Sequence, residues 1–147
     1  VATPASPAAS GRPPPGAELT GLPVLLLDDD KLVQAAVGDL LRSWGCRVQA
    51  AASLPEAEAL LGQGEAPRAL LVDWRLPGGL DGGLAFERLR ARIGRSVPAL
   101  IVTGDTTAEC RREVESRGYP LLCKPAQPAK LRSMLRHLVA RRASAPQ

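Results

Sequence analysis

Aromatic residues and long apolar runs are both scarce in this chain of 147 residues. Phe, Trp and Tyr together make up only 3% of the sequence, so any core must be packed mainly from Leu, Val and Ala. No apolar run approaches the roughly 20 residues that a membrane helix needs, and no secretory signal pattern is present. The sequence therefore predicts one aliphatic globular domain and no membrane partner for this fragment.

Cysteine and histidine are also rare. Cys46, Cys110 and Cys123 show no Cys-x-x-Cys spacing and, being three, cannot all pair. A disulfide framework and a metal–thiolate site are therefore disfavoured, and a reducing cytoplasmic location is expected. His137, the one histidine, lies in a predicted helix without a polar phosphotransfer context, so we expect an exposed helix residue rather than a phosphodonor.

Positive charge is in modest excess, with a formal net charge of +4 that comes mostly from arginine. Such an excess can indicate nucleic-acid binding when the basic residues cluster and alternate with aromatics. Here the arginines are scattered over predicted helices, and aromatic residues do not lie among them. We therefore expect solvated helix faces, and no nucleic-acid partner for this fragment.

The two ends of the chain differ in composition from its middle. Residues 1–21 are rich in Pro, Ala, Gly and Ser, and we expect a linker or disordered tail there, with a second tail at 142–147. One domain is expected between them, at 22–141. The chain starts at Val1 without an initiator methionine, so we expect it to be a piece of a longer protein or a processed product.

Short apolar runs and helical patterns alternate along the predicted domain. The expected strands are 23–27, 47–51, 69–72, 98–102 and 119–122, and the expected helices are 31–44, 54–62, 83–93, 107–117 and 127–141. This alternation predicts an α/β fold with a doubly wound, five-stranded parallel sheet covered on both faces. We expect the strand order 2-1-3-4-5, because it brings strands 1 and 3 together at the point where the winding reverses.

Four of these strands end abruptly in residues that can carry phosphoryl chemistry. The four strand ends are Asp28-Asp29-Asp30, Asp73, Thr103 and Lys124. Ligands of open α/β sheets bind outside the carboxyl ends of the strands, so we expect these side chains to converge at one edge.

A cluster of acids is unfavourable without a cation, and neither a GxGxxG loop nor a Walker lysine is present. A divalent cation held by oxygen ligands is therefore expected, and Mg²⁺ fits that donor set. Asp73 can serve as both metal ligand and nucleophile, because aspartyl nucleophiles form acyl phosphates. Lys124 and Thr103 are placed to neutralise and orient a transferring phosphoryl group.

These motifs together resemble the receiver domain of two-component response regulators over residues 22–141. The family pattern is an acidic pair, a phosphoacceptor aspartate, a Thr or Ser, and a Lys-Pro pair after successive strands. The matching residues here are Asp28-Asp29, Asp73, Thr103 and Lys124-Pro125. The resemblance implies the flavodoxin-like receiver fold.

The resemblance also implies a role for each residue. Asp29 and Asp73 would bind Mg²⁺ directly, Asp28 partly through water, and Arg75 through its backbone carbonyl. Asp73 would accept phosphate from the phosphohistidine of a histidine kinase or histidine phosphotransfer domain. Thr103 and Lys124 would contact the phosphate, and catalysis beyond self-phosphorylation and self-dephosphorylation is not expected of this fragment.

Phosphorylation would reposition the surface formed by 107–117, 119–122 and 127–141, through which the resemblance also allows a homodimer. Three features depart from the family pattern. The loop 73–82 has an extra residue, Leu121 stands where the family usually has an aromatic, and Arg75 places a cation at a position whose side chain influences phosphate hydrolysis in the family. Trp74, next to the phosphoacceptor, is expected to be either a partner contact or a half-buried side chain.

Several contexts and classes stay open at this stage. The segment 118–131 resembles the carboxyl-terminal receivers of hybrid sensor histidine kinases, and a stand-alone response regulator is the alternative. A haloacid-dehalogenase-like phosphatase is a remote alternative, because Asp28-x-Asp30 matches its Asp-x-Asp motif but leaves Asp73 unexplained. A degenerate receiver used only for dimerisation is disfavoured by the complete set of acids, Thr and Lys.

Overall fold

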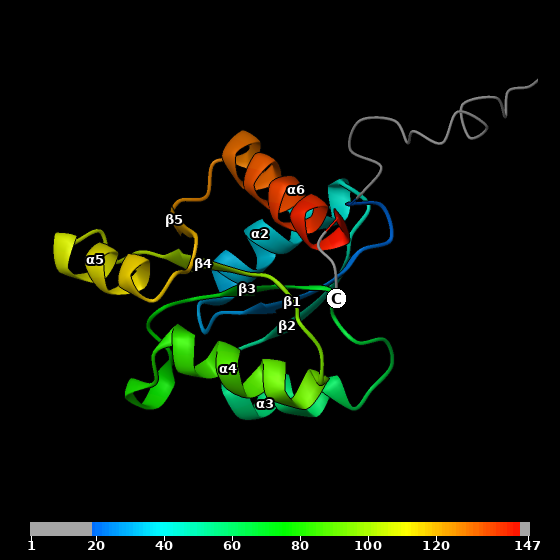
Figure 1. The fold of residues 1–147 in the computed structure, drawn as a ribbon, viewed down its shortest axis with the longest axis horizontal. Helices are drawn as coiled ribbons and strands as arrows, with labels where there is room; N and C mark the ends of the chain where they lie inside the picture. Colours follow the sequence, from blue (N-terminus) through cyan, green and yellow to red (C-terminus); the bar gives the residue numbers. More distant parts are fainter. Residues whose placement is uncertain (1–18, 145–147) are drawn as a thin grey trace, which may run out of the picture.

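The computed structural model describes residues 19–144, and the side chains of 19–140. Its five strands are β1 (Pro23–Leu27), β2 (Arg47–Ala51), β3 (Ala69–Val72), β4 (Ala99–Thr103) and β5 (Leu121–Cys123). They form one parallel sheet in the order β2-β1-β3-β4-β5, which confirms the predicted topology (Figure 1). Most of the predicted linker at 1–21, and the end of the predicted tail at 142–147, lie outside the described residues.

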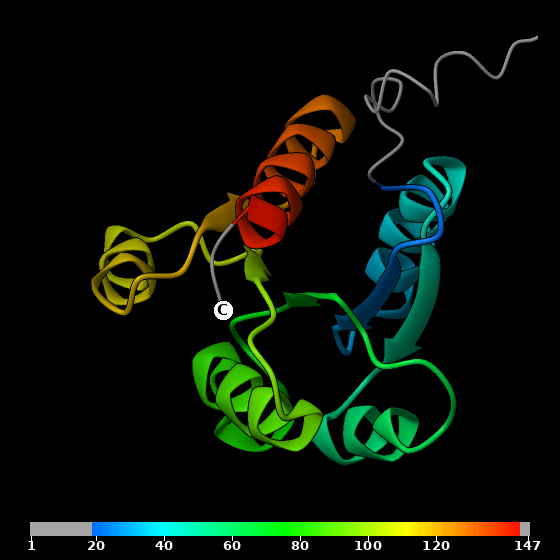
Figure 2. The ribbon, with the colours of Figure 1, turned by 45° about the vertical axis from the view of Figure 1, so that its right-hand side comes forward.

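Helices cover both faces of this sheet, as Figure 2 shows. The helices are α2 (Lys31–Ser43), α3 (Leu54–Leu61), α4 (Gly82–Ile93), α5 (Ala108–Ser116) and α6 (Pro128–Ser144), with a short 3-10 turn, η2, at Pro77–Gly79. Buried residues of α2 and α6 pack in one hydrophobic cluster, and those of α3, α4 and α5 pack in the other. None of the helices within 19–144 is long and apolar enough to cross a membrane.

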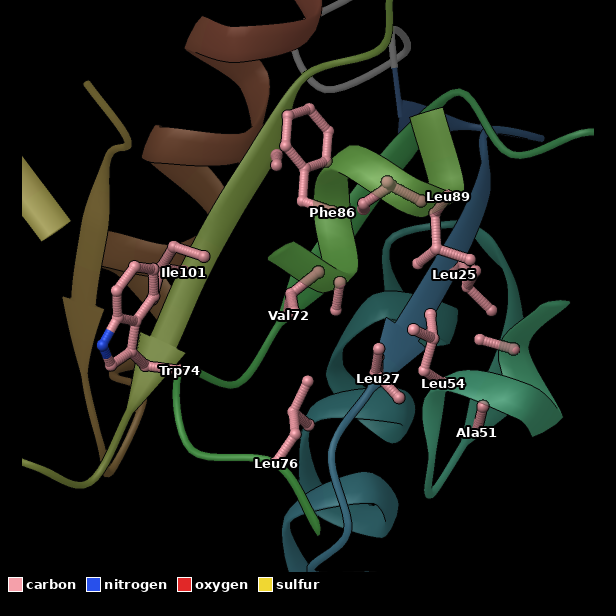
Figure 3. Packing of buried hydrophobic residues seen from close by; sticks show 14 of the residues in the cluster. Leu25, Leu27, Ala51, Leu54, Val72, Trp74, Leu76, Phe86, Leu89 and Ile101 are labelled. Carbon is pink, nitrogen blue, oxygen red and sulfur yellow. The ribbon is translucent and has the colours of Figure 1, made fainter. Parts of the chain in front are cut away.

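The central strands are apolar on both sides because both of their faces are covered. Every residue of β1, β3 and β4 is buried, as is typical of parallel strands between two helical layers. Side chains alternate between the faces: Leu25 and Leu27 pack in the cluster under α3 and α4 (Figure 3), whereas Val24 and Leu26 pack under α2 and α6.

Helix starts follow the capping rules closely. Asp30, Ser53, Asp81 and Thr107 are the N-caps of α2, α3, α4 and α5, and each side chain accepts a backbone N–H from the first turn. The Glu56 carboxylate also accepts the Ala52 N–H, so the predicted cap at Ser53 is reinforced by a second, reciprocal bond.

Three boundaries differ by two or more residues from the sequence-based expectation. Leu19 is fully buried, so the packed unit includes residues before 22. Helix α6 continues to Ser144, beyond the expected end at 141. Strand β5 begins at Leu121 rather than 119, because Pro120 has no N–H to donate to the ladder, although its carbonyl still accepts from Ile101.

Candidate functional site

Three carboxylates meet where β1 and β3 end. Asp28 and Asp29 follow β1, Asp73 follows β3, and one carboxylate oxygen of each lies within 4.8 Å of the others. Asp28 and Asp73 are buried, with 1% and 7% of their surfaces exposed, whereas Asp29 is open to solvent. The structure therefore brings together the predicted acidic ligands at one edge of the sheet.

The sheet ladder itself fixes the backbone of the two buried acids. The Asp28 N–H donates to the Ala51 carbonyl at 3.0 Å, and the Asp73 N–H donates to the Leu27 carbonyl at 2.9 Å. Asp28 is further held by the Asp30 N–H, which donates to its Oδ1 at 2.9 Å. Asp28 and Asp73 thus directly continue hydrogen-bonded strands, so the sheet, and not a flexible loop, holds their backbones in place.

Lys124 enters the same site from the end of β5. Its backbone N–H donates to the Thr103 carbonyl at 2.8 Å, and its Nζ lies 2.8 Å from Asp28 Oδ2 and 3.2 Å from Asp73 Oδ2. Its side chain is only 18% exposed, so solvent screens these pairs weakly. The ammonium group thus bridges the two buried carboxylates.

The pKa values in this site reflect burial and charge together. Burial raises the pKa of Asp73 above its ordinary value and the Asp28 charge raises it further, while Lys124 and the Arg75 N–H only partly offset this. Burial alone would lower the pKa of Lys124, but its hydrogen bond to Asp28 and the charges of Asp73 and Asp28 outweigh it, so that pKa is raised. Lys124 is therefore a firmly charged cation.

Thr103 ends β4, the strand next to β3, and Arg75 stands two residues after Asp73. Thr103 is fully buried, and its hydroxyl oxygen accepts the Asp105 N–H at 3.2 Å. The Arg75 N–H lies 3.4 Å from Asp73 Oδ1, which places the Arg75 backbone beside the phosphoacceptor candidate. Metal binding by the Arg75 carbonyl stays a prediction.

An ion pair that the sequence did not predict connects the loops after β3 and β4. The Arg75 guanidinium donates to Asp105 Oδ2 from Nη2 at 2.6 Å and from Nε at 3.1 Å. The pKa of Asp105 is lowered to about 2, first by the hydrogen bond from Thr107 and then by that from Arg75. The sequence offers one signal for this pair. Arg75 stands two residues after Asp73, and Asp105 stands two residues after Thr103, so both follow site residues at the ends of neighbouring strands.

Asp30 does not belong to the acidic cluster. Its Oδ1 accepts the Leu32 N–H at 2.9 Å and the Val33 N–H at 3.4 Å, as expected of a helix N-cap. Asp28 and Asp30 thus do not share one site, which removes the main support for a haloacid-dehalogenase-like phosphatase.

We predict that Asp30→Ala destabilises the protein without affecting the site. Losing the cap should lower the free energy of unfolding by about 0.5–2 kcal/mol, which urea denaturation measures. Mg²⁺ affinity measured by calorimetry should stay unchanged. Substantially weaker Mg²⁺ binding in folded Asp30→Ala would instead place Asp30 among the ligands.

Trp74, which follows Asp73 directly, is fully buried, so it is neither half-buried nor available as a partner contact. Its ring packs at a 58° angle to that of Tyr119, with centroids 6.3 Å apart. The Tyr119 hydroxyl donates to Glu87 Oε2 on α4 at 3.1 Å, so this ring turns toward α4. Leu121, in the position usually aromatic, is partly buried against the cluster under α3 and α4.

The donor set suits a divalent cation. Three carboxylates and one ammonium leave a net negative site, and hard oxygen ligands are those that Mg²⁺ prefers. Asp29 is the most exposed of the three acids, which leaves one side of the cluster open for water or for a phosphoryl oxygen.

Comparison with known proteins agrees with this geometry. The model of the response regulator receiver domain matches residues 24–136. The chain belongs to the response regulator receiver domain family. This match confirms the predicted class, and the observed sheet order confirms the predicted fold. Receiver domains in general bind Mg²⁺ at an acidic pocket and interact with histidine kinases or phosphotransfer proteins.

Individual relatives cover much of this receiver domain. A response regulator receiver protein of Anaeromyxobacter sp. (strain Fw109-5) is 37% identical over 112 residues, which are 76% of this chain but only 43% of that protein. The receiver domain of sensor histidine kinase PA1611 from Pseudomonas aeruginosa PAO1, solved with a magnesium ion in its active site cleft, is 31% identical. The match covers 82% of this chain and 99% of the PA1611 receiver chain, with a TM-score of 0.69.

A chemotaxis protein gives a similar match. Vibrio cholerae CheY4 is 25% identical, with a TM-score of 0.69, and the match covers 81% of this chain and 99% of that one. Relatives of different cellular roles thus share this fold, which fixes the family of the receiver domain but not its output.

Proposed function

We propose that this receiver domain is a phosphorylation switch in which Asp73 accepts a phosphoryl group from a phosphohistidine in an Mg²⁺-dependent reaction. The observation that carries the proposal is the convergence of Asp28, Asp29 and Asp73 around one ammonium group, that of Lys124. Asp28, Asp29, Asp73 and the Arg75 carbonyl are the proposed metal ligands. When bound there, Mg²⁺ supplies positive charge against the phosphoryl oxygens.

The residues of the site divide the work of transfer. A carboxylate oxygen of Asp73 bonds to phosphorus while the bond from phosphorus to the donor imidazole nitrogen breaks, which leaves an acyl phosphate and an imidazole. Lys124, already within 3.2 Å of Asp73 Oδ2, is placed to neutralise the incoming oxygens. The buried Thr103 hydroxyl accepts the Asp105 N–H, and no acceptor for its own proton is found among residues 19–140, so it can donate that proton to the phosphoryl group.

The proposed output surface is formed by α5, β5 and α6. A groove lies there, lined by side chains from the α5 helix, the β5 strand and the start of α6, among them Arg111, Leu121 and Lys130. Thr103 is the last residue of β4, and Lys124 directly follows β5, which lines this groove. A phosphoryl group on Asp73 would contact both residues, so each strand offers a direct route by which phosphorylation can change the groove. A homodimer through this surface is part of the proposal.

The cellular context is also part of the proposal. We infer that the domain acts in the cytoplasm and receives phosphate from a histidine kinase or a histidine phosphotransfer domain. The 31% identity with the receiver of a sensor histidine kinase supports a hybrid-kinase context, with a stand-alone regulator as the alternative.

Intact mass spectrometry tests the proposal. Incubation with acetyl phosphate and Mg²⁺ should add one phosphoryl group to the wild-type protein and none to Asp73→Asn, whose amide is a poor nucleophile. Omitting Mg²⁺ should also prevent the adduct. Equal phosphorylation of the wild-type protein and Asp73→Asn would exclude Asp73 as the acceptor.

A further inference from the structure

Three of the four aromatic residues of the chain pack together, and one of them, Trp74, directly follows Asp73. The rings of Phe86 and Tyr119 meet edge to face with centroids 5.6 Å apart, and Trp74 lies 6.3 Å from Tyr119. Figure 3 shows Trp74 and Phe86 within the same hydrophobic cluster, which also includes Ile101 of β4. The aromatic group is thus joined to the phosphoacceptor through Trp74.

Arg117, the C-cap of α5, joins this aromatic group to the loop after Asp73. Its guanidinium carbon lies 5.2 Å from the centroid of the Trp74 ring and 5.9 Å from that of Tyr119. Its Nη1 donates to Asp81 Oδ2 at 3.2 Å. The pair is partly shielded from solvent, with 32% of the Arg117 side chain and 27% of the Asp81 side chain exposed.

The loop 74–81 is therefore held by one side chain at both of its ends. Trp74 begins the loop, and Asp81 ends it as the N-cap of α4. The loop is closed by an isolated antiparallel β-bridge between the backbones of Arg75 and Asp81. In addition, the Leu76 N–H donates to the Leu80 carbonyl at 3.0 Å. Arg117 comes from another part of the chain and ties these two ends together.

Two features show that Arg117 fits closely rather than touching by chance. The Trp74 Nε1 has no hydrogen-bond partner among the described residues, so stacking and packing alone set the orientation of the ring. At Gly83, a Cβ atom would lie 2.5 Å from Arg117 Nη2 and 3.0 Å from Tyr119 Cε2, so any larger residue would displace the guanidinium. The start of α4 has room for Arg117 only because Gly83 has no side chain.

We propose that Arg117 is a positioning residue for the phosphoacceptor site. By stacking on Trp74 and pairing with Asp81, it fixes the loop that carries the Arg75 carbonyl and adjoins Asp73. This inference rests on the proposed function, in which that carbonyl and the Asp73 carboxylate bind Mg²⁺. Arg117 itself touches none of the three acids of the cluster in the described contacts, so it acts through Trp74 and Asp81.

The test compares Arg117→Met with Arg112→Met, which removes an exposed arginine from the same helix, α5. Calorimetry should show about tenfold weaker Mg²⁺ binding for Arg117→Met and wild-type binding for Arg112→Met, because groups that orient metal ligands typically have effects of this size. Arg117→Lys should fall in between, since lysine can still pair with Asp81 but lacks the planar stacking group. In the metal-free protein, amide hydrogen exchange should increase at 74–82 for Arg117→Met.

Each outcome distinguishes the two proposals. Failure of the wild-type protein to bind Mg²⁺ would contradict the proposed function itself. Wild-type binding together with equal affinity in folded Arg117→Met would overturn only the positioning role, even if that variant melts at a lower temperature. Should Arg117→Met not fold, Asp81→Asn removes the charge partner of Arg117 while keeping a helix cap, and the same weakening is expected.

Discussion

Replacing Lys124 with methionine should slow phosphoryl uptake by Asp73 by about two to three orders of magnitude, the usual cost of removing one donor to a developing oxyanion. Lysine and methionine stems fill similar space, so the main loss is the ammonium group that bridges Asp28 and Asp73 at 2.8 and 3.2 Å. The initial rate with acetyl phosphate, followed by intact mass, measures the effect.

The same variant should bind Mg²⁺ at least as tightly as the wild-type protein. The ammonium now contacts the Oδ2 atoms of two proposed metal ligands, so its loss removes a competing cation and leaves more negative charge for the metal. Lys130→Met, at an exposed position of α6, is the matched control and should leave both quantities unchanged. A Lys124→Met protein phosphorylated at the wild-type rate would show that Lys124 has no part in transfer.

Trp74→Ala should cause the largest loss of stability, about 3–5 kcal/mol in the free energy of unfolding, as is usual when a large buried aromatic is truncated. Trp74 is fully buried, and its removal would also take one ring contact from each of Arg117 and Tyr119. Urea denaturation followed by far-ultraviolet circular dichroism measures the change without relying on tryptophan fluorescence.

Trp44→Ala is the natural control for that measurement. Trp44 is only half-buried, at the end of α2, with the Arg132 guanidinium carbon 5.8 Å from its ring centroid. We expect a clearly smaller loss of stability than for Trp74→Ala. Equal losses in the two variants would contradict the central packing role assigned to Trp74.

The sheet and the acidic site could be predicted because both depend on local pattern. Strands buried on both faces leave continuous apolar runs, and a parallel sheet collects their ends at one edge, so Asp28, Asp73 and Lys124 had to meet. The start of α3 could also be predicted from neighbouring residues alone, because the side chain of its N-cap, Ser53, accepts the N–H of Glu56 three positions later.

Contacts made by long side chains across the fold could not be predicted in this way. Arg75 reaches Asp105 over 30 positions and Arg117 reaches Asp81 over 36, and nothing in local periodicity selects these partners among many arginines and acids. The burial of Trp74 was likewise undecided from sequence, because it depends on Arg117 and Tyr119 arriving from beyond α5. The residues that hold the phosphoacceptor loop therefore emerge only from the three-dimensional structure.

The most direct test of the central claim is the chemical identity and position of the phosphate. After treatment with acetyl phosphate and Mg²⁺, borohydride reduction should convert Asp73, and no other aspartate, to homoserine, because only an acyl phosphate is reduced in this way. Peptide mass spectrometry locates the product. Homoserine at Asp73 is the predicted result; a stable phosphate on a hydroxyl residue, or homoserine at Asp28 or Asp29 instead, would contradict the assignment of Asp73 as the phosphoacceptor.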